Sequence, residues 1–452
     1  MFPDALPLVL IAAPVATFVA IRWRRALLLS LPFLVTLNGV PLSGGGVSLR
    51  LDQLVACLLM IPLLAGAVAG TRRVRLDAAS VCLMALLATN VLSSVLNSPV
   101  PAYSIRQCVN LASTWVIYVL MLNFLESASE LEEFLACVVW AAIAASATGV
   151  IAFVLAVSGA SIGGAEVSTS AAENLTHAYG AYGTMIEPNI FGSFTAANLL
   201  LCGAMLVGRS GESSPRISRT LLRWAVVFTG IGLVLSFTRG AWLGTVVGAA
   251  CLIFAGRRTI RLRFRAGPLL ASLVVTGVLL GILLVLPGET GTFFRFKLAN
   301  IVNPASQTAL VRWFSSIVAL DQAAQHPFIG WGTFSFAALT AQGVDFQQFE
   351  NWRNLWIGNY LLLALHDTGV IGLVFLVGVV VTVLTSASRA IRAMARAQNE
   401  YASRVLGLTA AFASFLVAFL ATTGLSLGYS WLFMGLLACY ARLVNERKLI
   451  VE

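Results

Sequence analysis

The sequence predicts an all-α protein that crosses a membrane about 12 or 13 times. Of its 452 residues, 59% are hydrophobic and only 11% are charged, and the mean hydropathy is +0.89. A composition this apolar indicates that lipid, rather than water, surrounds most of the chain. The apolar residues also form successive runs of membrane-spanning length, and short clusters of arginine separate many of them.

Each apolar run of about 15–25 residues is interpreted as one span. The expected spans lie near 5–21, 26–40, 51–69, 78–95, 105–124, 134–157, 188–207, 221–237, 240–256, 267–287, 358–384, 405–424 and 429–443. The first two runs are short for membrane spans, and fusing one pair into a kinked helix would give the lower total. Because the first run leads directly into further spans and has no A-x-A-like site, we do not expect a cleaved signal peptide.

The arginine clusters predict the orientation of these spans. Most of the 29 basic residues fall in alternate loops, near 22–25, 72–75, 209–223, 257–265, 389–404 and 442–448. Loops rich in arginine and lysine face the cytoplasm, so 159–186 and 288–357 should lie outside. One expected cytoplasmic loop, 126–133, is acidic and departs from this bias. The basic residues left on the outer side are Arg50, Arg106, Arg239, Arg295, Lys297, Arg312 and Arg353.

The chain is expected to divide into a transmembrane bundle (1–287), an extracytoplasmic subdomain (288–357), and further spans with a cytoplasmic tail (358–452). Within the subdomain, residues 307–325 have helical periodicity. The apolar positions on one face of this helix are Leu310, Trp313, Phe314, Ile317 and Leu320. Arg312 lies off that stripe, on a face that should meet solvent or a ligand. We therefore expect this segment to roof a site in the membrane.

Cysteine usage and net charge exclude several other classes of protein. The 7 cysteines lie in or at the ends of expected spans, without C-x-x-C spacing. We expect them to be small buried hydrophobes, with no disulfide, no metal site and no cofactor. The net charge of +10 could suggest nucleic acid. Its placement between apolar runs indicates membrane orientation instead.

Arg239 is the sharpest single signal for chemistry. The segment SFTRGAWLG (236–244) joins two expected spans by a tight turn at the outer boundary. An arginine there either snorkels to the interface or meets a partner, and Gly240 would let a ligand approach closely. Arg312 is the natural second cation. Two guanidinium groups suit a pyrophosphate, and a lipid pyrophosphate is expected because nucleotides are scarce outside the cytoplasm.

Four motifs follow one another along the chain. They are GTMIEPNIFGSF (183–194), SFTRGAWLG (236–244), HPFIGWGTFSF (326–336) and GNYLLLALHDTGVIG (358–372). Their order resembles the O-antigen ligase and O-antigen polymerase superfamily of bacterial membrane glycosyltransferases. Each motif is degenerate, but four in this order and on the expected outer side make the resemblance fairly specific.

The resemblance implies a metal-independent, inverting glycosyl transfer at the outer face of the bacterial plasma (inner) membrane. A glycan carried on undecaprenyl pyrophosphate would move to a hydroxyl of a glycan or glycolipid acceptor. Arg239 and Arg312 would hold and neutralise the leaving pyrophosphate. The candidate substrate-binding residues are Asn189, Asn359, Asp367, Arg295 and Arg353.

The chain departs from the family pattern at Gly358, where ligases of the family have a histidine that assists deprotonation of the acceptor. Glu187 and His366 are the candidate replacements, and Glu187 is slightly favoured because it should lie nearer the outer water. Each has a second interpretation. Glu187 could instead pair with an arginine, and His366 could be hydrogen-bonded between spans, with Asp367 orienting its ring.

Two further function classes compete with glycosyl transfer. A transporter or flippase of a lipid-linked glycan would concentrate charge near the bilayer midplane and often repeat its halves, and the sequence has neither feature. A non-enzymatic scaffold would leave Arg239 and Arg312 without a role. Within the transferase class, the residues do not separate ligation from polymerisation, although the missing histidine modestly favours a polymerase.

Overall fold

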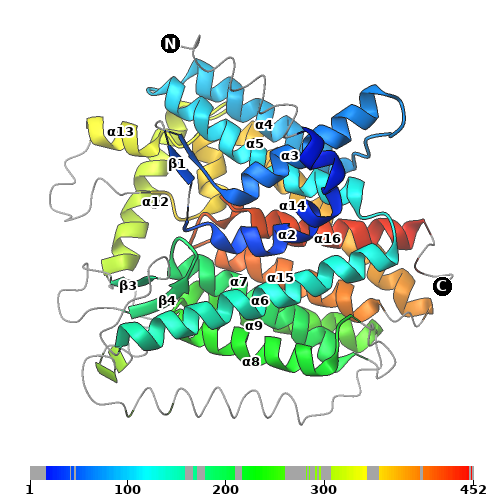
Figure 1. Ribbon diagram of the computed structural model, residues 1–452. Helices are drawn as coiled ribbons and strands as arrows, with labels where there is room; N and C mark the ends of the chain where they lie inside the picture. The colour runs from blue at the N-terminus through cyan, green and yellow to red at the C-terminus, as the bar shows by residue number, and fades with distance from the viewer. Residues whose placement is uncertain are drawn as a thin grey trace.

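The computed structural model of the chain is a bundle of α-helices (Figure 1). It describes residues 17–40, 42–44, 47–157, 166–169, 179–208, 216–259, 281, 285, 291–292, 295–296, 307–343, 356–397, 401–446 and 449. The elements before residue 184 are α2 (Arg24–Leu34), η1 (Val35–Leu37), β1 (Leu42–Gly44), β2 (Val47–Leu49), α3 (Leu51–Val68), α4 (Ala78–Leu96), α5 (Pro101–Phe124), α6 (Ala128–Val157), β3 (Glu166–Thr169) and β4 (Tyr179–Gly183). Those after it are α7 (Pro188–Val207), α8 (Arg219–Leu235), α9 (Arg239–Thr259), α12 (Gln307–Gln325), α13 (Phe336–Gly343), α14 (Tyr360–Ala397), α15 (Ala402–Ala418), η3 (Gly424–Ser426) and α16 (Gly428–Asn445).

The predicted all-α polytopic membrane fold is confirmed. Among the described residues, 7 helices are long and apolar enough to cross a membrane: α3, α4, α5, α6, α7, α9 and α14. The only strands in the described part of the chain form two short antiparallel hairpins, β1–β2 and β3–β4. The expected spans near 5–21 and 267–287 lie mostly outside the described residues.

The span expected near 26–40 is shorter in the structure, where α2 ends at Leu34 and a 3-10 turn follows it. Pro32 lies inside α2 and removes one backbone hydrogen bond from the helix. Beyond the turn, Asn38 Nδ2 donates to Val35 O at 3.0 Å, and Gly39 N–H donates to Thr184 O at 2.9 Å. The chain therefore turns towards the start of α7 instead of continuing as a helix.

Helix α15 packs against both α7 and α9. Glycines allow this approach, as small residues do between helices in lipid. A Cβ added at Gly407 would lie 2.9 Å from Ala204 Cβ, and one added at Gly248 would lie 2.6 Å from Ala410 O. The close packing holds α7 and α9 side by side, and their N-terminal ends lie near one another, where Thr238 donates to Pro188 O.

The acidic loop 126–133 is paired with arginines of the clusters that the sequence assigns to the cytoplasm. The ion pairs are Arg72–Glu126, Arg25–Glu133 and Arg404–Glu132. The third pair is buried: Arg404 Nη2 donates to Glu132 Oε2 at 3.0 Å, and Tyr440 donates to Glu132 Oε1 at 3.0 Å. Charge pairing thus accounts for the acidic residues that depart from the positive-inside bias.

Helices α12 and α13 and the two hairpins gather at one end of the bundle, and the C-terminus lies at the other (Figure 1). Helix α12 runs across the ends of the bundle helices rather than along them (Figure 1). Helix α14 is broken at Gly369, which has φ of 64°. The break separates a short segment at the α12 end from a long segment that continues through the bundle.

Candidate active site

The segment 326–332, HPFIGWG, is hydrogen-bonded to the broken turn of α14. The Val370 N–H donates to Pro327 O at 2.8 Å, and the Trp331 N–H donates to His366 O at 2.9 Å. These bonds take the place of helical bonds that the break leaves unmade. Two of the motifs, separated in the sequence, therefore form one structural unit.

Two motif glycines allow this unit to form. A Cβ at Gly369 would lie 2.3 Å from Phe328 C, and a Cβ at Gly330 would lie 2.5 Å from Asp367 C. Both glycines also have positive φ, 64° and 76°. The position of each glycine thus follows from backbone sterics, since only glycine adopts this conformation without strain and leaves room for the opposing backbone.

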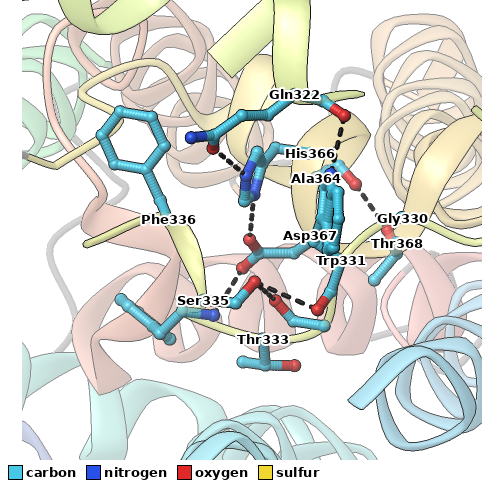
Figure 2. A network of polar contacts seen from close by, with 12 residues as sticks. Gln322, Gly330, Trp331, Thr333, Ser335, Phe336, Ala364, His366, Asp367 and Thr368 are labelled. Atoms are coloured by element: carbon cyan, nitrogen blue, oxygen red, sulfur yellow. Dashed lines mark hydrogen bonds and ion pairs between the residues drawn. The ribbon is translucent and has the colours of Figure 1, made fainter. Parts of the chain in front are cut away.

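His366 lies within a buried network of polar contacts (Figure 2). Its Nδ1 is 2.8 Å from Asp367 Oδ1, and its Nε2 is 2.9 Å from the side-chain amide of Gln322. Because a carboxylate only accepts, Nδ1 carries a proton and donates to Asp367. The ring also packs edge-on against Phe336. Both ring nitrogens are therefore engaged within the protein.

The second oxygen of Asp367 fixes the backbone of Phe334. Asp367 Oδ2 accepts the Phe334 N–H at 2.9 Å. Phe334 has φ of 55°, a conformation that a side chain such as phenylalanine rarely adopts. The carboxylate of Asp367 therefore connects the imidazole of His366 to Phe334, a strained residue just after the HPFIGWG segment.

Polar side chains of α4 complete the network. Ser93 Oγ donates to Asp367 O at 2.7 Å, and Asn90 Oδ1 accepts from Thr333 Oγ1 at 2.7 Å. Ser94 Oγ accepts the Thr333 N–H at 3.0 Å. The motifs carried no sign of these residues. The available signal was a stripe of polar residues three and four apart in an apolar span, which indicates an inward-facing polar surface.

The helix predicted over 307–325 is confirmed as α12, but the orientation of its faces differs from the expectation. Its apolar stripe is exposed, with Trp313 66% exposed. The buried positions are instead small or polar: Ser315, Ala319, Gln322 and Ala323. Small side chains let α12 lie close to α14, and Gln322 bonds to His366 there. Arg312 lies half-buried on α12.

Arg239 is the first residue of α9, directly after a turn that is fastened to α7. Thr238 Oγ1 donates to Pro188 O at 3.0 Å. Phe237 has φ of 50°, so the turn is tight. Arg239 is consequently held at the N-terminus of α9, beside the first turn of α7.

Glu187 precedes α7 in the N-cap position, but its side chain does not cap the helix. Its Oε1 accepts a hydrogen bond from Thr422 Oγ1 at 2.9 Å. The preceding residue, Ile186, donates its N–H to Asn38 Oδ1 at 3.0 Å. The carboxylate is thus held between the start of α7 and the α15–α16 connection.

Arg312, Arg239 and Glu187 share one electrostatic environment. Burial lowers the pKa of the Arg312 guanidinium below its usual value, the charge of Glu187 raises that pKa, and the charge of Arg239 lowers it. An arginine remains protonated at neutral pH despite such a shift. The charges of Glu187 and Arg239, which the sequence placed in separate segments, therefore both reach the Arg312 guanidinium.

This arrangement has the chemistry of an anion site with an adjoining hydrogen-bond acceptor. Two guanidinium groups outnumber one carboxylate, and the first turn of α9 supplies backbone N–H groups and the positive end of a helix dipole. Glu187 presents a carboxylate to the same region. Among the described residues, no group of three or more His, Cys, Asp or Glu is placed to hold a metal ion.

The other predicted binding residues are placed differently. Asn359 Oδ1 accepts the N–H groups of Leu361 and Leu362, and so begins α14. Asn189 is half-buried in the first turn of α7, near Glu187 in the chain. Arg295 is exposed and donates to Thr292 Oγ1 at 3.1 Å. The prediction for Arg353 lies outside the described residues.

The segment 224–377 matches the family model described as O-antigen ligase. The match bears out the resemblance of the motifs to this family over these residues. It extends from α8 into α14 and includes Arg239, Arg312 and His366, whereas Glu187 precedes it. No curated protein matches the chain.

Proposed function

We propose that the chain is a glycosyltransferase of surface-polysaccharide synthesis, because residues 224–377 match the family model described as O-antigen ligase. The donor is a glycan on undecaprenyl pyrophosphate, and the acceptor is a hydroxyl of a second glycan or glycolipid. The reaction takes place at the outer face of the bacterial plasma membrane, where the charge pattern puts α12 and the start of α9.

The observation that carries this proposal is that the charges of Arg239 and Glu187 both act on the Arg312 guanidinium. Two guanidinium groups can bind both phosphates of a pyrophosphate through paired hydrogen bonds. Burial makes each such interaction stronger than in water, and negative charge grows on the pyrophosphate as it leaves. Stabilising that charge lowers the barrier to transfer without a metal ion.

The step itself is a displacement at the first sugar of the donor. The acceptor oxygen forms a bond to the anomeric carbon from the side opposite the pyrophosphate, which inverts that centre. The bond from the anomeric carbon to the phosphate oxygen breaks, and its electron pair leaves with the lipid pyrophosphate. The proton of the acceptor hydroxyl passes to a base.

We assign the base to Glu187. Thr422 donates to its Oε1, and its other oxygen has no hydrogen-bond partner among the described residues, so that oxygen can accept the acceptor hydroxyl. His366 has no such open position, because both ring nitrogens are bonded inside the protein. His366 and Asp367 are therefore positioning residues that hold α12, and with it Arg312.

We assign the reaction to polymerisation rather than ligation. Gly358 stands where ligases of the family have their histidine. A Cβ at Gly358 would meet Trp356 at 3.5 Å and Ala421 O at 3.7 Å, both ordinary contact distances. The absence of a histidine there is therefore not forced by crowding at the first side-chain atom.

The anion site is tested by Arg239→Lys and Arg312→Lys, with Arg73→Lys in the α3–α4 loop as the matched control. Lysine keeps the charge but loses the planar pair of donors. We expect each site variant to transfer less than about a hundredth of the wild-type glycan, the range seen when one donor to a developing anion is removed. The control should be fully active. Near-normal product from both site variants, with normal insertion, would show that the arginines only anchor the topology.

A further inference from the structure

A cavity of about 570 Å³ with polar side chains in its lining lies between α3, α5 and the segment before α7. The side chains that define its character are Tyr103, Arg106, Gln107, Asn110, Tyr182 and Phe334. The family match includes only Phe334 among these six residues. Arg106 is one of the outer basic residues that neither the topology nor the anion site explains.

The lining has the mixture of groups that recognises a sugar. Asn and Gln amides both donate and accept hydrogen bonds, as sugar hydroxyls do, and aromatic rings pack against the C–H faces of a pyranose. Asn110 Nδ2 donates to Gln107 Oε1 at 3.2 Å, which leaves the Gln107 amide nitrogen and the Asn110 oxygen available. Arg106 is exposed and has no hydrogen bond or ion pair within the described part of the chain. No carboxylate is among the described residues that line the cavity.

Two parts of the cavity lining belong to segments that also hold Glu187. Met185 and Ile186 line one wall and immediately precede Glu187 in the chain. Ser426 lines another wall, at the end of the short connection on which Thr422 donates to Glu187. The lining of the cavity thus ends at the residue directly before Glu187 in the chain.

Phe334 connects this cavity to the buried network. Its positive φ is a strained conformation, and strain of this kind persists where surrounding contacts enforce it. Asp367 supplies that contact through the Phe334 N–H, and His366 in turn holds Asp367. The network thus fixes the backbone of one residue of the cavity lining.

We propose that this cavity binds the sugar of the acceptor glycan that carries the attacking hydroxyl. Arg106, Gln107 and Asn110 bind its hydroxyl groups, and the aromatic rings of Tyr103 and Phe334 pack against its faces. The proposal rests on the glycosyl transfer proposed above and assigns acceptor recognition to a part of the chain that is mostly outside the matched family segment.

The test compares Arg106→Ala and Gln107→Ala with Arg73→Ala, an exposed arginine of the α3–α4 loop. The full chain is reconstituted in nanodiscs, and the probe is an oligosaccharide released by mild acid from the polysaccharide of the source cell. Binding is measured by saturation-transfer NMR, and transfer from the lipid-linked donor is measured separately. We expect each cavity variant to weaken oligosaccharide binding about 10- to 100-fold, the usual effect of losing hydrogen bonds to a charged or buried group.

The KM for the donor should stay within about twofold of wild type in both cavity variants, because the pyrophosphate site is separate. Unchanged oligosaccharide binding in a wild-type-like transferase would overturn the cavity proposal and leave the function intact. A raised donor KM with unchanged acceptor binding would also overturn it, by assigning the cavity to the donor. Oligosaccharide binding that depends on Arg106, in a protein that transfers nothing from an intact donor, would support the cavity and refute the transferase.

Discussion

Glu187 and His366, the two candidates for the base, are held differently in the structure. From the sequence, either could replace the family histidine, and Glu187 was slightly favoured because it should lie nearer the outer water. In the structure, His366 is fully buried and bonded at both nitrogens, whereas one carboxylate oxygen of Glu187 accepts no hydrogen bond from any residue that the structure describes. The deciding contact comes from Gln322, 44 positions before His366. Motif spacing contains no information about such a contact, so the sequence could identify the two candidates but favour Glu187 only slightly.

At this scale, the base assignment predicts a large and selective effect of Glu187→Gln. The amide cannot take the proton of the acceptor hydroxyl, so turnover should fall by about 10²- to 10⁴-fold, the usual contribution of a general base. The KM for the donor should change little. Thr422→Val removes only the bond that orients Oε1, and its loss of turnover should be smaller. Wild-type turnover by Glu187→Gln, measured with purified protein and lipid-linked donor, would refute the assignment.

The positioning role of His366 predicts that Gln322→Ala reproduces the effect of His366→Ala. Each substitution breaks the same bond between α12 and α14, so both should lower the thermal midpoint and the activity together. The double variant should add little to either single one, because the two residues act as one contact. Full activity in Gln322→Ala beside an inactive, stably folded His366→Ala would instead indicate that the imidazole acts on the substrate.

Among the elements, α12 shows what periodicity can and cannot reveal. The repeat of apolar residues predicted its bounds, since the 3.6-residue period depends only on local geometry. The buried face was not predictable by hydrophobicity, because at a lipid boundary an exposed apolar stripe carries no penalty. The face that packs on α14 carries Ser315 and Ala319, whose small size permits the close approach. The break in α14 was likewise not predictable from hydrophobicity, because it lies within a continuous apolar run.

The interlocked loop and helix break predict that Gly369→Ala is far more damaging than an ordinary glycine substitution. The new Cβ would lie 2.3 Å from Phe328 C, at a residue with φ of 64°. Positive φ alone costs about 1 kcal/mol or more for alanine, and the clash adds to it. Gly230→Ala in α8 is the control, since nothing lies within 4 Å of its Cβ and alanine favours the helix by about 1 kcal/mol. Thermal unfolding in detergent should show a lower midpoint for the first variant only, and equal midpoints would contradict the interlock.

Across the whole molecule, the bilayer explains why so much of the fold could be predicted. Lipid requires every span to satisfy its own backbone hydrogen bonds, so span positions follow from apolar runs one at a time. Arginine clusters then orient the spans without knowledge of their packing. The contacts between spans lack such a rule. Helix α15 packs against both α7 and α9, and this packing holds the segments of Glu187 and Arg239 together. It depends on glycines and on surfaces formed by segments far apart in the sequence.

The orientation itself is open to a direct test with cysteines introduced at Gln325 and Arg73. Both positions are exposed, the first at the end of α12 and the second in the α3–α4 loop. In a background whose 7 native cysteines are replaced, a membrane-impermeant thiol reagent should label position 325 in cells with a permeabilised outer envelope. Position 73 should react only after the plasma membrane is opened. The reverse pattern would put Arg239 and Arg312 on the cytoplasmic side, where nucleotide phosphates compete for any cationic site. That result would refute the proposal of a transferase at the outer face. Because the charge pairs of loop 126–133 hold its acidic residues against the same arginine clusters, the acidic loop should share the labelling behaviour of position 73.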